Sequence, residues 1–252
     1  GTGYNDTGLS GATAYSYRVR ATDSGGNLGP YSNVASATTT GATPVITYVQ
    51  QNYANPQTPQ TSVAVKFTAT QGSGDLNVVV VGWNDSIATV GTVTDSSGNV
   101  YKPAVGPTVQ SGTASQAIYY AANIVGAAAN ANTVTVTFTT AARYADIRIL
   151  EYGGIDPNSP LDVTATGTGS STLSSTASVT TTYANDLIIG ANLVQTGTTG
   201  AGAGFTSRVI TQPDSDIVED RIVTATGSYS ATAPVSPSAA WIMQLAAFRR
   251  HP

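Results

Sequence analysis

The chain has 252 residues, of which 10% are charged, with a formal net charge of −4, no cysteine and one histidine. Its ten Lys and Arg residues form no basic cluster and face fourteen acids, so binding to a phosphate backbone lacks an electrostatic driving force. Without Cys there are no disulfides, thiolate metal sites or Cys nucleophiles. No apolar run reaches the roughly 20 residues of a membrane-spanning helix. We therefore expect no nucleic-acid partner and no membrane insertion.

The first forty residues alternate in the manner of half-buried β-strands. Tyr15, Tyr17, Val19 and Ala21 fall on one face, followed by a Gly-rich turn and a closing strand at 31–39. With Leu9 and Thr13 ahead of Tyr15 in the spacing of a tyrosine corner, this segment resembles the last strands of a bacterial fibronectin type III domain. The resemblance implies a partial unit at residues 1–40.

This partial unit leaves an apolar face to be covered. A complete sandwich of that family needs roughly 100 residues, and each large apolar side chain left bare forfeits about 1.5–3 kcal/mol. Three explanations stay open: the chain is a piece of a longer protein with upstream domains, the half-sandwich packs on the following domain, or strands of another chain complete it. The predicted assembly face comprises Leu9, Tyr15, Tyr17, Val19 and Val34.

After a linker at residues 41–45, residues 46–252 predict one large antiparallel β-sandwich of jelly-roll type. Short β-rich runs are separated by Gly, Asn, Asp and Pro, and helix signals are nearly absent. The Ala-rich segment 123–134 predicts a loop because Gly and Asn interrupt it. Strands are predicted at 44–51, 62–70, 75–83, 116–124, 133–140, 146–154, 177–182, 186–194, 205–211, 217–227 and 240–249.

Two pairs of segments in this domain are similar and keep their order. Residues 74–83 resemble residues 185–194, and residues 144–155 resemble residues 238–248. This pattern indicates two related half-sandwiches, the alternative being that strand-rich segments resemble one another in general. As a whole the domain resembles β-sandwich modules at the C-terminal ends of large secreted bacterial proteins, which implies an extracellular or cell-surface location.

The sequence offers little catalytic chemistry. The one histidine, His251, is the penultimate residue, which argues against His-based acid–base catalysis. Glu151 and Glu219 are the two glutamates, and neighbouring arginines favour structural ion pairs over a glycosidase pair. We expect no enzyme activity, no cofactor and no metal.

Glycan binding requires exposed aromatic rings with polar groups beside them. The best local cluster is Trp83, Asn84 and Asp85 at the end of a predicted strand, so these three residues are the hypothetical glycan contact.

The abundant uncharged, Thr-rich strands with few edge lysines favour a different function. The first hypothesis is an extracellular structural or adhesive protein, a filament or surface-assembly subunit joined by β-strand complementation through the N-terminal half-sandwich. The alternative is an accessory carbohydrate-binding module of a larger secreted bacterial enzyme.

Overall fold

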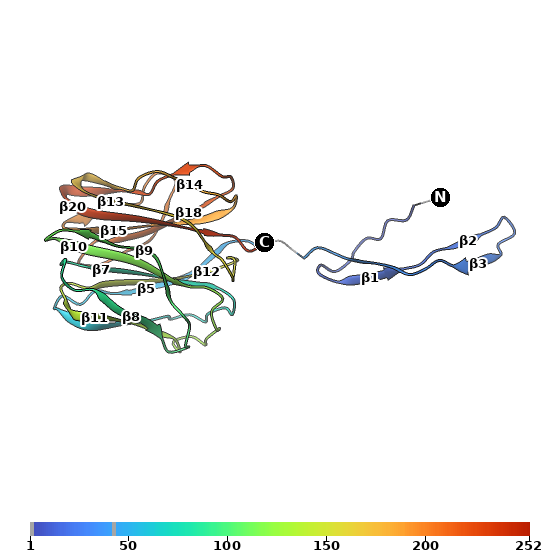
Figure 1. Cartoon of the computed structure of the whole chain (residues 1–252), viewed down its shortest axis with the longest axis horizontal. Coiled ribbons are helices and arrows are strands. Elements are labelled where there is room, and N and C mark those ends of the chain that lie inside the picture. The colour runs from blue at the N-terminus through green and yellow to red at the C-terminus, as the bar shows by residue number, and fades with distance from the viewer. Residues whose placement is uncertain (1–2, 42–43) are drawn as a thin grey trace. The chain divides into compact units, whose positions relative to one another are not determined.

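The computed structural model describes residues 3–41 and 44–252, and the regular elements in these ranges are all β-strands (Figure 1). This confirms the all-β prediction. Contacts divide the chain into residues 1–43 and 44–252. The predicted linker at 41–45 includes residues 42–43, which lie outside the described residues. No helix that is long and apolar enough to cross a membrane occurs among the described residues.

The N-terminal unit consists of two short antiparallel ribbons. Strand β1 (Ala14–Tyr17) pairs with β4 (Ala35–Thr38), and β2 (Arg20–Thr22) pairs with β3 (Leu28–Tyr31). Two-stranded ribbons are marginally stable by themselves in water because they bury little apolar surface. The ribbons themselves thus contribute little to the stability of this unit.

The C-terminal unit consists of two halves of eight strands each. The strands of the first half are β5 (Thr47–Ala54), β6 (Gln60–Lys66), β7 (Leu76–Trp83), β8 (Val90–Asp95), β9 (Lys102–Gln110), β10 (Ala114–Ala121), β11 (Thr133–Ala142) and β12 (Asp146–Gly153). Those of the second half are β13 (Leu161–Ser175), β14 (Val179–Thr180), β15 (Asp186–Val194), β16 (Gly197–Thr198), β17 (Thr206–Ile210), β18 (Ile217–Val223), β19 (Ser228–Tyr229) and β20 (Thr232–Arg249).

The two halves have the same topology. The first half contains a sheet of order β5-β12-β7-β10-β9, and the second a sheet with the same five-strand order, β13-β20-β15-β18-β17, in which each strand number is eight higher. The fourth strands differ, because β8 pairs with β11 in a small sheet, whereas the short β16 is added to the large sheet by pairing with β20. In both halves the first strand pairs with the eighth, the second with the seventh and the third with the sixth. This nested pairing is that of a jelly roll. The predicted all-β, jelly-roll-like sandwich is confirmed, but the repeated pairing gives two complete eight-stranded units rather than two halves of one sandwich.

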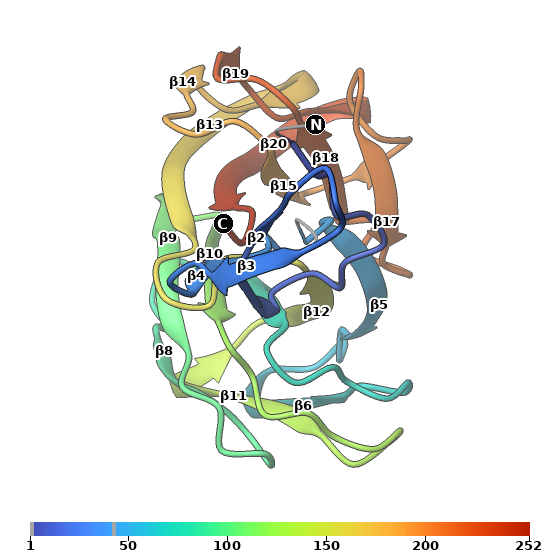
Figure 2. The ribbon, with the colours of Figure 1, turned by 90° about the vertical axis from the view of Figure 1, so that its right-hand side faces the viewer.

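The two five-stranded sheets pack face to face, with the smaller sheets outside them (Figures 1 and 2). On the inner face of β7, Val78 and Val80 share one core with Leu187 and Ile189 of β15. On the outer face of β7, Val79 and other residues pack against β6 and β11. A strand covered on both faces has no polar side, which explains the uninterrupted valine run of β7.

A buried polar network joins the two halves at this central interface. Arg148 of β12 donates from Nη1 to the carbonyl oxygens of Asn192 (2.8 Å) and Ile217 (2.9 Å) in the second half. Its Nε lies 3.0 Å from Asp146 Oδ1, and both side chains are fully buried. Close packing continues beside it, because a Cβ added at Gly82 would meet Leu193 Cδ1 at 2.9 Å. The Arg148 guanidinium thus hydrogen-bonds two backbone carbonyl groups of the second half and links the two halves.

Candidate functional site

The tyrosines of the predicted assembly face lie on one side of the β1–β4 ribbon. Tyr15 is paired with Ala37 and Tyr17 with Ala35 in the strand register, so both rings point to the same face. The Tyr15 hydroxyl accepts a hydrogen bond from the backbone N–H of Ser10 at 2.9 Å. That contact has the form of a tyrosine corner, which the resemblance to fibronectin type III domains implies.

The other predicted members of this face are unequally covered. Val19 is 71% exposed, Val34 63% and Tyr17 36%, whereas Leu9 and Tyr15 are half-buried. The described part of the N-terminal unit therefore presents apolar side chains to water.

The predicted glycan contact at Trp83 needs correction because the ring is in the core. Trp83 is 1% exposed, its ring meets Phe138 edge-on at 5.6 Å, and its Nε1 donates to the carbonyl oxygen of Ala88 at 3.0 Å. A ring covered on all sides cannot stack on a sugar.

Asn84 and Asp85 follow β7 and make structural contacts. Asn84 Oδ1 accepts a hydrogen bond from Gln195 Nε2 at 2.9 Å, which links the two halves. Asp85 Oδ1 accepts from the backbone N–H of Ile87 (2.9 Å), and Oδ2 accepts from that of Arg143 (3.0 Å). Burial raises the pKa of Asp85, but the backbone hydrogen bonds outweigh burial and hold the pKa below its ordinary value. Asp85 is therefore a turn cap.

The two glutamates do not form a glycosidase pair. Both are fully buried, and they lie in different halves. Glu151 Oε2 accepts from Gln50 Nε2 (2.6 Å), whereas Glu219 Oε2 accepts from the backbone N–H of Gly202 (2.7 Å). Burial raises the pKa of Glu219 to about 7. These contacts make both residues parts of the fold rather than of an open cleft.

The expected countercharge within residues 219–221 is also corrected. Asp220 pairs with Arg208, whose Nε lies 2.7 Å from Oδ2, and it also accepts a hydrogen bond from the Tyr152 hydroxyl. Arg221 instead lies over the ring of Tyr229, 5.5 Å from its centroid. Arg221 shares a face of β18 with Glu219 but stacks on Tyr229, and no ion pair between Arg221 and Glu219 occurs among the described residues.

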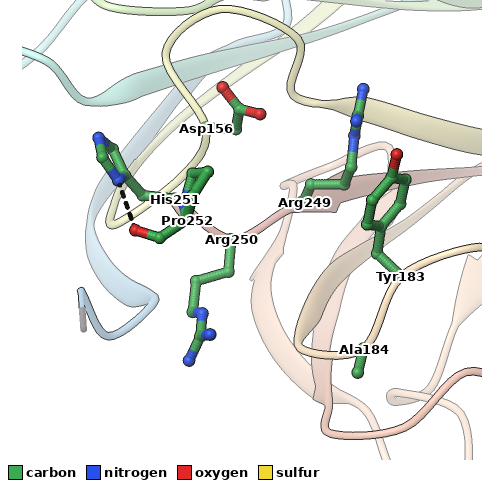
Figure 3. A pocket seen from close by; sticks show the side chains of 7 residues that line it. All are labelled: Asp156, Tyr183, Ala184, Arg249, Arg250, His251 and Pro252. Carbon is green, nitrogen blue, oxygen red and sulfur yellow. Dashed lines mark hydrogen bonds between the residues drawn. The ribbon is translucent and has the colours of Figure 1, made fainter.

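An open cleft of about 310 Å³ lies at one end of the second half (Figure 3). It combines an aromatic ring, a carboxylate, two guanidinium groups and an imidazole, which come from three places in the fold: the loop after β12, the loop before β15 and the end of β20. Its lining residues are Asp156, Tyr183, Ala184, Arg249, Arg250, His251 and Pro252.

Tyr183 is the exposed ring of this cleft. Its side chain is 49% exposed, and the guanidinium carbon of Arg249 lies 4.5 Å from the ring centroid (Figure 3). Arg249 is held by its backbone N–H, which donates to the carbonyl oxygen of Pro160 at 2.7 Å. The stacked cation orients the ring while nearly half of the tyrosine stays open to solvent.

The charged groups opposite Tyr183 are fixed by backbone contacts. Asp156 accepts hydrogen bonds from the N–H groups of Asn158 (2.9 Å) and Ser159 (3.2 Å), and the first of these is the main reason that its pKa lies below the ordinary value. His251 donates from its backbone N–H to the carbonyl oxygen of Gly154 at 2.9 Å. Asp156 is thus an ionised hydrogen-bond acceptor at the rim.

This arrangement fits a sugar better than a metal ion. An oriented ring stacks on the C–H face of a pyranose, and carboxylate and guanidinium groups bind hydroxyls. Among the described residues, no three His, Asp or Glu side chains lie close enough to hold a metal ion.

Sequence reasoning did not identify Tyr183 or Arg249 as candidates for this role. A tyrosine in the polar turn just before the strand that begins at Asp186 was the available signal. The predicted cluster at Trp83 to Asp85 lies elsewhere: Asn84 contacts Gln195, which follows β15, whereas Tyr183 precedes β15. The strand β15 separates the two regions.

Comparison with known proteins gives one informative similarity. A 93-residue segment, 37% of this chain, is 37% identical to part of an alpha-amylase of Niallia circulans. The segment covers 7% of the amylase, so the match concerns a small part of that protein. No family model and no solved structure matches the chain. The resemblance of residues 1–40 to fibronectin type III domains therefore stays a prediction.

Proposed function

We propose that this chain is an accessory, non-catalytic glycan-binding part of a larger secreted bacterial enzyme that acts on polysaccharide. The observation that carries the proposal is the similarity to a small segment of an alpha-amylase. Enzymes that degrade insoluble polymers gain from a module that holds them on the substrate, because attachment raises the effective substrate concentration. An α-glucan such as starch is the ligand class that the relative's name suggests, and extracellular location follows from such a substrate.

The cleft at Tyr183 is the surface that best supports this role. Its half-exposed ring and the groups of Asp156 and Arg249 give one stacking surface with polar partners. The fully buried Glu151 and Glu219 supply no open carboxyl pair for hydrolysis.

Retention on starch tests the proposal. The full chain is passed through native gels with and without soluble starch, and Tyr183→Ala is compared with Tyr144→Ala, which removes a ring of similar exposure (44%) outside the cleft. We expect the starch-dependent delay to fall about fivefold or more in Tyr183→Ala and to persist in Tyr144→Ala, since a stacked ring of similar size on a flat ligand contributes on the order of 1–3 kcal/mol. No delay in the unaltered chain, or equal delay in both variants, would contradict the proposal.

A second candidate function is assembly through the N-terminal unit. The specific observation is the exposure of Tyr17 at the end of β1, of Val19 just after β1 and of Val34 just before β4, beside a sheet of only two strands. Strands from a neighbouring copy that cover this face would bury several large apolar groups, each worth about 1.5–3 kcal/mol.

Light scattering distinguishes this second function. Tyr17→Asp places a charge on the apolar face, whereas Ser36→Asp places the same charge on the opposite face, where Ser36 contacts Ser16. Assembly through the face predicts oligomers in the unaltered chain and in Ser36→Asp, and monomers in Tyr17→Asp. A monomeric unaltered chain at high concentration would exclude it.

A further inference from the structure

The loop that carries Tyr183 is tied to the second half by Asp162 of β13. Asp162 Oδ2 accepts a hydrogen bond from the backbone N–H of Thr182 at 2.7 Å, and Oδ1 accepts one from the Thr182 hydroxyl. Thr182 directly precedes Tyr183, so these two contacts fix the backbone beside the ring. Loss of Asp162 as an acceptor would free the loop.

A second carboxyl group, that of Asp186, lies within hydrogen-bonding reach of Asp162. Asp186 is fully buried, and neither of its oxygens receives a hydrogen bond from an N–H or hydroxyl group of the described residues. Asp162 is half-buried, whereas burial of Asp186 disfavours its charged form, and two neighbouring carboxylates repel each other unless one of them carries a proton. A protonated Asp186 can donate a hydrogen bond to Asp162, whose remaining acceptor positions stay available to the N–H and hydroxyl groups of Thr182.

The surroundings of Asp186 contain one cation. In the strand register Asp186 lies between Arg249 of β20 and Val223 of β18, and the valine carries no charge. The Arg249 guanidinium stacks on Tyr183 and forms no hydrogen bond with Asp186. Burial is the main cause that raises the pKa of Asp186, contact with Asp162 also raises it, Arg249 lowers it in part, and together they set the pKa to about 7.

The first half contains a related pair at the equivalent position. Asp75 immediately precedes β7, as Asp186 begins β15, and it packs against Glu151. Burial and contact with Glu151 raise the pKa of Asp75 to about 6. The loop before β7 carries no aromatic ring, so this pair serves as an internal comparison.

We propose that Asp162 and Asp186 form a proton-operated latch, which holds the Tyr183 loop in place in mildly acidic surroundings and releases it as the pH rises. The latch would regulate the cleft, so its consequence for glycan binding rests on the proposed function. Its existence does not, because the loop can be observed without a ligand.

The direction of the pH effect follows from the two states of the latch. With the loop held, Asp186 keeps its proton up to a pKa of about 7; with the loop released and hydrated, its pKa returns toward the ordinary 3.8. The held state therefore binds more protons between these values. The ratio of held to released loop falls by up to about tenfold per pH unit as the pH rises from about 4 to about 7, and then stays level.

Hydrogen exchange of the Thr182 amide measures the latch directly, because this N–H donates to Asp162. Protection factors, corrected for the intrinsic pH dependence of exchange, are measured on the full chain from pH 5 to pH 8. We expect the protection of Thr182 to fall up to about pH 7 and then to level. The Thr176 amide, which donates to the carbonyl oxygen of Ala231, is the reference. A parallel fall at Thr176 would show global opening instead and would overturn the latch.

Two matched variants complete the experiment. Asp186→Asn keeps a neutral donor against Asp162, so Thr182 should stay protected at every pH tested. Asp75→Asn removes the equivalent carboxyl group in the first half and should leave the profile of Thr182 unchanged. A pH-independent profile in the unaltered chain, or an unaltered profile in Asp186→Asn, would refute the latch.

Starch retention, measured in the same buffers, separates the two proposals. A pH-dependent Thr182 amide without starch retention would support the latch and refute the proposed function. Starch retention with a pH-independent Thr182 amide would do the reverse.

Discussion

Replacement of Arg148 by Met should uncouple the two jelly rolls. Met fills much of the volume of the arginine stem but removes the guanidinium, so the carbonyl oxygens of Asn192 and Ile217 lose their donor. Asp146 loses its ion pair while it stays fully buried. Removal of one partner from a buried ion pair costs about 3–5 kcal/mol of unfolding free energy. Burial already raises the pKa of Asp146, so this carboxyl can bind a proton once Arg148 is replaced. Its neutralisation limits the loss of unfolding free energy to about 3–5 kcal/mol.

Each half contains one tryptophan, which allows the halves to be followed separately. Trp83 lies in a core of the first half and Trp241 in a core of the second. Trp83→Phe leaves Trp241 as the fluorescent reporter of the second half, and Trp241→Phe leaves Trp83 as that of the first. In urea, the two proteins should unfold at the same midpoint, because the large sheets of both halves contribute to one core. Arg148→Met should lower the midpoint and separate the two transitions.

Arg143→Met is the matched control, since the Arg143 side chain is exposed and its backbone contacts survive the change. Exposed substitutions of this kind stay within about 0.5 kcal/mol. A loss below about 1 kcal/mol in Arg148→Met, with coincident transitions, would refute the view that this network joins the halves.

Three other predictions concern the fold. Trp83→Ala should cost about 3–5 kcal/mol in urea unfolding, because a large buried ring is removed, while the folded fraction keeps its starch retention. Gly167→Ala should lower stability by about 1–3 kcal/mol in thermal unfolding, because the new Cβ would clash with the carbonyl oxygen of Ser175. Glu219 binds its proton more tightly in the folded state, with a pKa of about 7 against an ordinary 4.5. Its contribution to stability is therefore lost as the pH rises from about 4.5 to about 7, by up to about 1.4 kcal/mol per pH unit. Glu219→Gln should show a shallower decline between pH 5 and pH 7 than the unaltered chain.

The strands that form the core were predictable because fully buried strands consist mainly of apolar residues. The apolar runs at 75–83, 146–154, 186–194 and 240–249 coincide with β7, β12, β15 and the second part of β20. Even the duplication was visible in these runs, since equivalent strands occupy equivalent layers and need similar residues. The Ala-rich segment 123–134 contains no strand before its last two residues, in agreement with its prediction as a loop.

Two edge strands, β9 and β13, were missed for a related reason, although the opposite edges, β5 and β17, were predicted. Strand β9 contains Pro103 and Pro107, and β13 is rich in Gly, Ser and Thr, so neither has the pattern of a buried strand. Both lie at the edge of their sheet, where a proline is tolerated and fewer side chains face a core. The role of Trp83 was mispredicted because a strand end next to Asn and Asp is typical of a rim, whereas Phe138 and β11 cover this one.

The duplication itself restricts where this unit can bind a ligand. Each five-stranded sheet has one face on its own small sheet and the other on the opposite half, so neither offers an open concave surface. Binding groups must then come from loops at strand ends, and there the halves differ. Residues 183–185 before β15 are Tyr-Ala-Asn, whereas residues 72–74 before β7 are Gly-Ser-Gly. The equivalent loop of the first half thus has no ring to compensate for the loss of Tyr183, so Tyr183→Ala should abolish the proposed binding rather than halve it.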